Sequence, residues 1–347
     1  MDLMLIMVKK DNAMEQIFDQ KYPNINVYRL ESESLCVDII NLGATITSIR
    51  YKKDDTDVVL GYDTIDEYQK FKNYYGATIG RCANRIAKGA FTLHDQAYHL
   101  DINDHGNSLH GGKNGFHTRL FQVLAYDKTS VTMRYNSPDM EEGYPGNLIL
   151  DITFTLHDDT LCIEYSAISD QDTIVNFTNH SYFALQGHGD GSVDEQILTM
   201  NASYYAENDE NRLVTGKLSE TKGTPFDFTK GKAIGKDIYD QMNIQIQRAN
   251  GYDHYFRFDE NKEHMVKLVD QKHQHSLIVK TDLPGFHLYV PDDQEPQHGK
   301  HGKEYIGHCA VCIETSYMPD AINLQECPET LLKANEKYTT KTTYQFQ

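Results

Sequence analysis

The sequence contains no tryptophan, few cysteines and a minority of basic residues. Without tryptophan, the 23 tyrosines and 14 phenylalanines must supply every aromatic surface on which a ligand could stack. The 33 lysines and arginines are outnumbered by 51 aspartates and glutamates, which gives a formal net charge of -18. Nucleic acids and anionic membranes attract basic proteins, so this charge argues against both as partners.

The six cysteines are scattered over 347 residues, a distribution that does not indicate a disulfide framework. Cys309 and Cys312 have the spacing of a redox or zinc motif, but no second pair of cysteines or histidines lies at zinc-finger distance. The segment around them is apolar and resembles a strand. We therefore interpret both as packed thiols.

No apolar run in the sequence is long enough to span a bilayer. Residues 1–8 are apolar except for Asp2, but the lysines follow this run instead of preceding it, which is the reverse of a secretory signal. We therefore predict a cytoplasmic protein. Residues 1–13 are expected to form a loose N-terminal tail, with Met14 as an alternative start.

Alternation of apolar and polar residues dominates the sequence, most clearly in residues 131–135, 148–156, 161–167 and 338–346. A period of two residues, interrupted by clusters of Asp, Asn and Gly, predicts antiparallel β-strands. The polar turn at 157–160 predicts a hairpin. No low-complexity linker and no fixed repeat divides the chain, so we predict one β-sandwich-like domain over residues 1–347.

Helical periodicity is scarce in this sequence. Two segments favour short helices. The first is residues 63–72, with Asp63 or Thr64 as its N-cap, and the second is residues 236–247.

Two histidines and two carboxylates lie in short segments that can carry chemistry. His110 precedes two glycines, which permit close approach of a ligand to the backbone. His180 has aromatic neighbours, which partly desolvate an imidazole and bring its pKa near working pH. Asp253 also lies among aromatic residues, a combination that suits sugars because rings cover C–H faces while the carboxylate accepts hydroxyl hydrogens. Glu314 lies in an apolar strand, where it is either a paired structural ion or a tuned acid or base.

Arg81 and Arg85 flank Asn84 in an otherwise apolar stretch. An arginine is a permanent cation that suits hydroxyls or carboxylates, and the alternative is a structural pair with a buried acid. Five further histidines show no carboxylate or cysteine partner in the sequence, so we predict no metal site; they are His273, His275, His298, His301 and His308.

These segments together resemble the aldose 1-epimerase family, also called galactose mutarotases, from about residue 41 to residue 338. The order and spacing of the shared segments carry the resemblance, because each segment alone is only moderately specific. They are residues 80–86, 109–116, 143–146, 179–183, 251–254 and 314–323.

The resemblance implies an all-β fold, a large antiparallel β-supersandwich with a few short helices and a shallow, open cleft. It implies that Glu314 removes the proton of a sugar's C1 hydroxyl and that His180 protonates the ring oxygen. The ring then opens, the aldehyde group rotates about the C1–C2 bond, and closure of the ring gives the other anomer. A glutamate with a pKa of about 4.3 and a histidine with a pKa of about 6.5 start in suitable opposite states near neutrality.

The resemblance also implies which residues bind the substrate, a free aldose such as galactose or glucose. The expected substrate-binding residues are Asn84, Arg85, His110 and Asp253, and we add Tyr289 as a stacking platform. No oxidation or group transfer occurs in such a reaction, so we predict no cofactor. The protein is expected to be a monomer or a homodimer.

Two departures from the family pattern bear on sugar preference. Ala184 stands where the family often has Asn, and His287 stands where some members have a substrate-binding Gln. Three alternatives stay open. They are an epimerase that prefers maltose or another sugar, a hexose-6-phosphate epimerase that would depend on Arg81 and Arg85, and a non-catalytic sugar-binding protein.

Overall fold

Antiparallel strands dominate the computed structural model, which describes residues 17–18, 21–71, 73–292, 295–324 and 328–347. The predicted all-β class is confirmed. The expected tail at residues 1–13, Met14 and Cys327 lie outside the described residues. Within the described ranges, no helix is long and apolar enough to cross a lipid bilayer.

The largest sheet has nine strands and contains the predicted hairpin at residues 157–160. In spatial order its strands are β10 (Gln122–Tyr126), β11 (Ser130–Ser137), β12 (Leu148–His157), β13 (Thr160–Ser169), β29 (Lys337–Phe346), β23 (His275–Thr281), β22 (Met265–Asp270), β17 (Ile197–Met200) and β20 (Lys232–Ala233). The alternation seen in the sequence sets its faces, because Leu150 and Ile152 are fully buried whereas Ile149 is 40% exposed.

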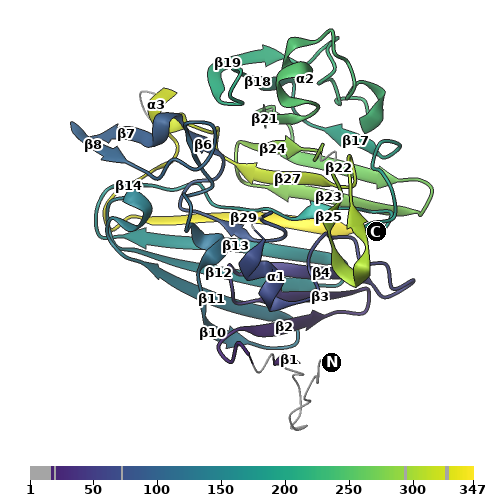
Figure 1. Cartoon of the computed structure of the whole chain (residues 1–347), viewed down its shortest axis with the longest axis horizontal. Helices are drawn as coiled ribbons and strands as arrows, with labels where there is room; N and C mark the ends of the chain where they lie inside the picture. The colour runs from purple at the N-terminus through teal and green to yellow at the C-terminus, as the bar shows by residue number, and fades with distance from the viewer. Residues whose placement is uncertain (1–16, 19–20, 72, 293–294, 325–327) are drawn as a thin grey trace.

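Two further sheets complete the main body. The four-stranded sheet is β1 (Ile17–Phe18), β2 (Asn26–Glu31), β3 (Leu35–Ile40) and β4 (Thr45–Tyr51). The six-stranded sheet is, in order, β16 (Tyr182–Phe183), β27 (Val311–Ser316), β24 (Gly285–Tyr289), β21 (Asp253–Arg257), β18 (Tyr204–Asn208) and β19 (Val214–Glu220). Figure 1 shows β21, β24 and β27 above β29 and β10–β13.

Short strand pairs connect these sheets. They are β5 (Thr78–Ile79) with β15 (Thr178–Asn179), β6 (Arg85–Ile86) with β9 (Ser108–Leu109), β7 (Ala90–Leu93) with β8 (Gln96–His99), β14 (Thr173–Ile174) with β28 (Leu331–Leu332), and β25 (Gln297–His298) with β26 (Glu304–Tyr305). One continuous apolar cluster runs from Tyr28 to Phe346 and packs all three large sheets together.

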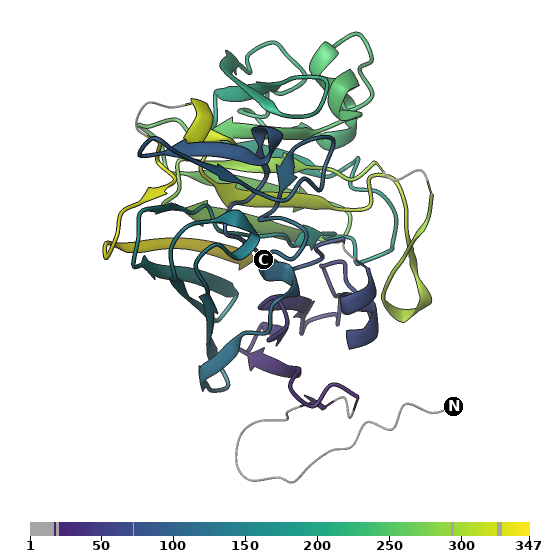
Figure 2. The same cartoon turned by 60° about the vertical axis from the view of Figure 1, so that its left-hand side comes forward.

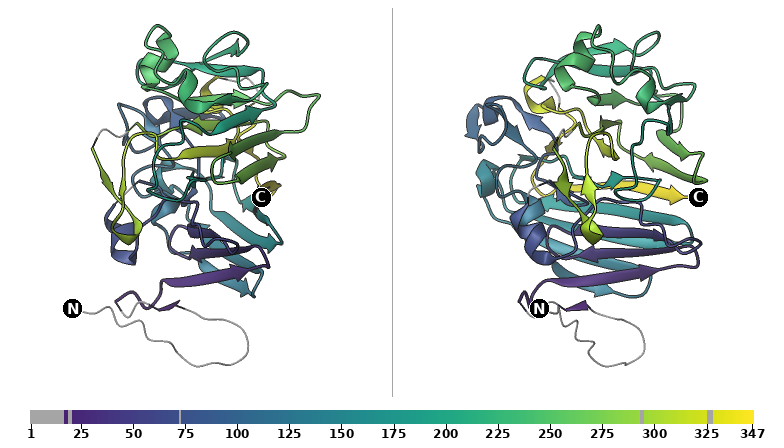
Figure 3. Two further views of the ribbon diagram at one scale, coloured as in Figure 1. Left: turned by 90° about the vertical axis from the view of Figure 1, so that its right-hand side faces the viewer. Right: turned by 45° about the vertical axis from the view of Figure 1, so that its right-hand side comes forward.

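The described helices are short: α1 (Ile65–Lys70), α2 (Ile244–Ala249) and α3 (Ala321–Leu324), with single 3₁₀ turns at Ala87–Gly89, Phe116–Thr118, Glu141–Gly143, Ile234–Lys236 and Lys300–Gly302. In Figure 2, α3 lies beside the β7–β8 hairpin, and the Asn323 amide donates to the Ala90 carbonyl over 3.0 Å. Figure 3 shows the β25–β26 hairpin beside α1. His298 Nε2 of β25 lies 2.6 Å from Glu67 Oε1 of α1.

The first predicted helix is confirmed and the second is largely wrong. Thr64 caps α1 in a capping box, since its hydroxyl accepts from the Glu67 N–H and the Glu67 carboxylate accepts from the Thr64 N–H. The predicted helix at 236–247 begins only at Ile244. The Asn243 side chain caps α2 by accepting from the N–H groups of Gln245 and Ile246. Met242 before it is 95% exposed, so the preceding apolar residues do not form one buried face.

Candidate active site

The six-stranded sheet places several candidate site residues on one of its faces. His287 of β24 lies directly opposite Glu314 of β27, and Asp253 of β21 lies opposite Tyr289 of β24. Opposed residues of an antiparallel pair share a face, so these four side chains emerge on the same side. The alternate residues, among them Phe286, Leu288 and Ile313, point into the apolar core, which fixes the strand register and hence the polar face.

His180 follows β15 and is fixed through both its backbone and its ring. Its N–H donates to the Ala77 carbonyl over 2.9 Å, and its own carbonyl accepts from the Gly76 N–H over 3.0 Å. The rings of Tyr182 and Tyr74 stack with the imidazole at centroid distances of 4.9 and 5.7 Å, each tilted by 24°. The imidazole is therefore in contact with two tyrosines that restrict its rotation.

His180 and Glu314, the residues predicted as acid and base, meet in one buried place. His180 Nε2 lies 3.5 Å from Glu314 Oε1, and both side chains are less than 5% exposed. Burial raises the pKa of Glu314 well above its ordinary value, and the charge of Asp253 adds to this effect. Burial lowers the pKa of His180 to about 3.

These pKa directions correct the expectation that the pair starts as carboxylate and imidazolium. Both groups are shielded from water. In the protein without substrate, burial therefore favours a protonated Glu314 beside a neutral His180. The sequence argument used unperturbed values, which omit burial. The two charge states differ only in whether the shared proton lies on Glu314 or on His180. The two atoms that can carry it, Glu314 Oε1 and His180 Nε2, are 3.5 Å apart.

His110 stands beside this pair and is oriented by Asn84. Its ring centroid lies 5.1 Å from that of His180. The backbone N–H of Asn84 donates to His110 Nδ1 over 3.2 Å. The backbone N–H of His110 in turn donates to the Asn84 carbonyl over 3.0 Å. Because burial lowers the pKa of His110 well below its ordinary value, the ring is neutral and carries its one proton on Nε2.

The glycines after His110 allow close packing of the loop. A Cβ on Gly111 would lie 1.8 Å from the Gly80 carbonyl oxygen, and one on Gly112 would lie 2.5 Å from a carboxylate oxygen of Glu142. Both residues have positive φ angles. They allow the His110 loop to lie directly against the backbone at Gly80.

His110, His180 and Glu314 place three possible metal-ligand atoms within 4.8 Å of one another. Two histidines and a carboxylate are a common donor set for transition metals. In His110, however, the Nδ1 lone pair already accepts the Asn84 N–H and Nε2 carries the proton, so the neutral ring has no free lone pair for a metal. This arrangement favours a hydrogen-bond donor over a metal ligand, and the absence of a metal stays a prediction.

Asp253 lies next to one histidine and two arginines. Its Oδ1 lies 2.5 Å from His287 Nε2, and its Oδ2 lies 3.7 Å from Arg85 and 3.8 Å from Arg212. Burial alone would raise the pKa of Asp253, but the His287 hydrogen bond and the charge of Arg85 outweigh it and hold this pKa well below the usual range. Arg85 also donates to Asp104 over 2.7 Å. Sequence reasoning missed Arg212 and Asp104, because ion pairs between distant segments leave no local signal.

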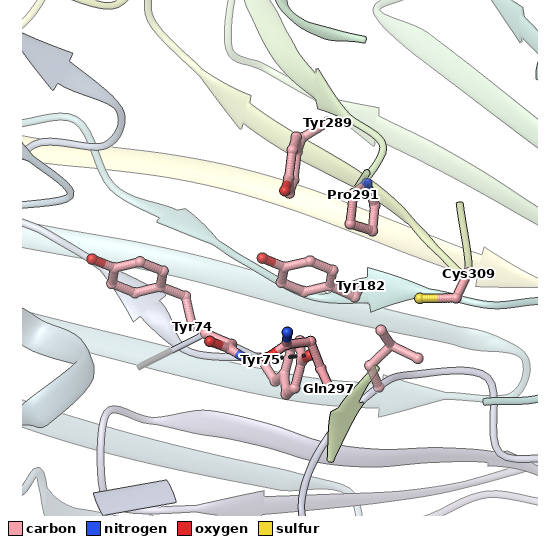
Figure 4. A pocket seen from close by; sticks show the side chains of 9 residues that line it. Tyr74, Tyr75, Tyr182, Tyr289, Pro291, Gln297 and Cys309 are labelled. Carbon is pink, nitrogen blue, oxygen red and sulfur yellow. Dashed lines mark hydrogen bonds between the residues drawn. The ribbon is translucent and has the colours of Figure 1, made fainter. Parts of the chain in front are cut away.

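A pocket of about 210 Å³ adjoins this cluster, and we call it the tyrosine pocket (Figure 4). Tyr289 faces Tyr182 edge-on, with 6.1 Å between ring centroids, and both rings line this pocket. Ala184 is fully buried in the apolar cluster that contains Tyr75 and Tyr182. The described lining residues are Leu60, Asn73, Tyr74, Tyr75, Tyr182, Tyr289, Pro291, Gln297 and Cys309.

Arg81 has a structural role and takes no part in this cluster. Its guanidinium donates to the hydroxyl of Ser137 and to the carbonyls of Ser137, Pro138, Pro145 and Gly146. It therefore holds the 137–146 loop through backbone oxygens, whereas the structural alternative drawn from the sequence was a pair with a buried acid.

The expectation that the remaining histidines lack carboxylate partners is wrong. Each lies next to its own acid, at 2.6 to 3.5 Å: His273 with Asp270, His275 with Asp54, His298 with Glu67, His301 with Asp63, and His308 with Asp194. Four of these five acids are remote in the sequence, which is why they could not be recognised there. Because each histidine has a different partner, the five do not converge on one point.

Cys309 and Cys312 are buried in the apolar cluster around Tyr182, so their interpretation as packed thiols is confirmed.

Comparison with known proteins gives one consistent match. The model of a family described as aldose 1-epimerase matches residues 26–345. Galactose mutarotase of Rattus norvegicus is 39% identical over 332 residues, which cover 93% of this chain and 94% of that protein. Aldose 1-epimerase of Escherichia coli (strain K12) is 30% identical over 337 residues, covering 93% of this chain and 96% of that protein. The structure of galactose 1-epimerase from Lactobacillus acidophilus NCFM superposes with a TM-score of 0.82 at 28% identity, covering 99% and 98% of the two chains.

Proposed function

Because this chain belongs to the aldose 1-epimerase family and is an isomerase, we propose that it interconverts the α and β anomers of free aldoses such as galactose or glucose. The observation that carries the proposal is the contact between His180 Nε2 and Glu314 Oε1, at 3.5 Å. The C1 hydroxyl and the ring oxygen of a pyranose are bonded to the same carbon. One sugar can therefore meet both groups at once.

In the proposed reaction, Glu314 accepts the proton of the C1 hydroxyl while His180 donates a proton to the ring oxygen. The C1–ring-oxygen bond breaks, the aldehyde rotates about C1–C2, and closure with reversed proton transfers gives the other anomer. This direction needs the carboxylate and imidazolium form of the pair. A hydroxyl that donates to Glu314 and a ring oxygen that accepts from His180 both stabilise that form, so substrate binding moves the shared proton from Glu314 to His180.

The neighbouring residues hold the sugar and the acid in place. His110 offers a neutral Nε2–H as a donor, with Asn84 fixing its tautomer. Asp253 stays ionised, and its Oδ2 is too far from Arg85 and Arg212 for direct hydrogen bonds, so it is available to accept from a sugar hydroxyl. Arg85 keeps that carboxylate charged, and Tyr289 offers an aromatic surface for the C–H face of a sugar.

The alternative of a hexose-6-phosphate substrate finds little support in this geometry. Of the two arginines that the sequence offers for phosphate, Arg81 is occupied by loop carbonyls, and Arg85 lies between Asp104 and Asp253. A phosphate would meet these two carboxylates as well as the cation, and like charges repel.

Further aspects of the proposal follow from composition and packing. We propose one domain, supported by the continuous cluster from Tyr28 to Phe346. We also propose a cytoplasmic location, supported by the scattered positions of the six cysteines in the sequence, which do not indicate a disulfide framework. Sedimentation of the purified chain would distinguish the monomer from the homodimer.

Polarimetry on freshly dissolved α-galactose and α-glucose tests the activity. The purified protein should accelerate the approach of the optical rotation to equilibrium in proportion to enzyme concentration, whereas a Glu314→Gln preparation serves as the matched control. An approach to equilibrium that is the same with and without the protein would overturn the proposal and would favour a sugar-binding protein without catalysis.

A further inference from the structure

Arg212 is the more exposed of the two arginines beside Asp253. Its side chain is 31% exposed, whereas the side chains of Arg85 and Asp253 are each 8% exposed. Nη1 of Arg212 lies 3.8 Å from Asp253 Oδ2, and Nη1 of Arg85 lies 3.7 Å from the same oxygen. The Asp253 carboxylate therefore lies between a buried arginine and one that also reaches solvent.

The loop that carries Arg212 is a closed turn fastened to the strand of Asp253. It joins β18 to β19, and the Asp209 carboxylate closes it by accepting from the Asn211 N–H over 2.8 Å. At the end of β18, Nδ2 of Asn208 donates to the Asp253 carbonyl over 2.8 Å. These contacts hold the backbone of the turn beside β21, so the Arg212 guanidinium meets the Asp253 carboxylate.

The two arginines differ in what their donors already contact. Arg85 donates from Nε to Asp104 over 2.7 Å and from Nη1 to the Arg212 carbonyl over 3.3 Å. In the described part of the chain, the Arg212 guanidinium makes no direct hydrogen bond, and Asp253 is its one ion-pair partner. A guanidinium has five N–H donors, so Arg212 keeps donors for a ligand.

The gap between Arg212 and Asp253 suits a single hydroxyl group. At 3.8 Å, Nη1 and Oδ2 are beyond the range of a direct hydrogen bond, which ends at about 3.2 Å. One oxygen atom can lie about 2.7–3.0 Å from both of them, because two such distances together exceed their separation. A hydroxyl in that position donates its hydrogen to the carboxylate and accepts one from the guanidinium, and both bonds are strengthened by charge.

We infer that Arg212 is a substrate-binding residue, which donates to the same sugar hydroxyl that Asp253 accepts. The inference rests on the proposed anomer interconversion and adds to it a residue outside the segments that carry the family resemblance. Arg212 takes no part in proton transfer, because a guanidinium in a protein keeps its protons. It holds the hydroxyl both before and during ring opening, so it lowers KM and leaves kcat unchanged.

The test measures KM and kcat by polarimetry with the aldose that the wild type converts fastest. Arg212→Leu should raise KM about tenfold, the lower end of what a hydrogen bond to a charged group contributes, and should leave kcat within about twofold. Arg212→Lys keeps the charge but loses the planar fork of donors, so it should recover part of the lost affinity. Glu210→Gln is the control for a change of charge in the same turn, because Glu210 is exposed.

Two further measurements separate binding from folding and from electrostatics. Arg212 has a φ of 60°, so Arg212→Gly relieves backbone strain, which offsets the greater freedom of the unfolded chain. This variant should keep the melting temperature of the wild type while raising KM as Arg212→Leu does. The pH dependence should also stay the same. Burial raises the pKa of Asp253, but the His287 hydrogen bond and the charge of Arg85 outweigh it, and both remain in these variants.

Monodeoxy sugars that keep the C1 hydroxyl decide whether Arg212 touches the substrate. For the sugar that lacks the shared hydroxyl, the wild type and Arg212→Leu should have equal KM values, whereas the difference should persist for the others. A wild-type KM in Arg212→Leu, a parallel fall in kcat, or the same KM ratio for every deoxy sugar would overturn the inference and leave the proposed function standing. A wild type that is inactive on every aldose would instead contradict the proposed function, and the inference with it.

Discussion

Replacing Asp253 by Asn separates the electrostatic role of this residue from its shape. Asn keeps the size of the side chain and one oxygen for His287 but removes the charge that faces Arg85 at 3.7 Å. At an effective dielectric constant of about 20, two unit charges at that distance attract by about 4 kcal/mol. Breaking a buried pair costs about 3–5 kcal/mol, and Asp104 still pairs with Arg85, so we expect a loss of about 3 kcal/mol in the free energy of unfolding.

The same substitution should change the pH dependence of catalysis. Asp253 raises the pKa of Glu314, so its removal lowers that pKa, and the alkaline limb of kcat/KM moves to lower pH. Asp104→Asn is the matched control, because it also weakens the ion pair of Arg85 but is not among the main contributors to the Glu314 pKa. Polarimetry from pH 5 to 10, together with thermal unfolding, measures both effects. An unchanged alkaline limb in Asp253→Asn would refute the electrostatic reasoning.

Three further predictions address the acid limb, the loop and the first helix. Because burial lowers the pKa of His180 to about 3, kcat/KM should stay flat as pH falls through 6.5, where an unperturbed histidine would already gain its proton; a loss of activity centred near 6.5 in the folded protein would contradict this. Arg81→Met should lower stability by about 3 kcal/mol or more in chemical unfolding, since several carbonyls lose their donor, and a near-native midpoint would be incompatible with its role. Thr64→Ala should cost about 1 kcal/mol with unchanged kcat.

Much of the fold follows from local sequence signals. The alternation in residues 148–156 and 161–167 predicts β12 and β13, because one buried face requires every second residue to be apolar. Thr64 and Glu67 form a local capping box that a sequence can reveal. The error at residues 236–247 has the opposite cause, because the spacing of apolar residues did not show that Tyr239 and Met242 are exposed.

The candidate site depends more on contacts between distant segments. The resemblance directed attention to His180 and Glu314, which the structure brings together from segments far apart in the sequence. The charge state of the pair could not be predicted, because it depends on burial by the surrounding residues. Tyr182 lies two residues after His180 and was visible as an aromatic neighbour, whereas Tyr74 comes from a separate loop and had no such signal.

A double-mutant cycle on Glu314 and His180 tests the central claim most directly. Polarimetric turnover would be measured for the wild type, Glu314→Gln, His180→Asn and the double variant. If the two groups exchange protons with one sugar, each single variant should lose at least about a hundredfold in kcat, and the double variant should be little worse than either single one. Near-native turnover in either single variant, or losses that multiply fully in the double variant, would contradict the account.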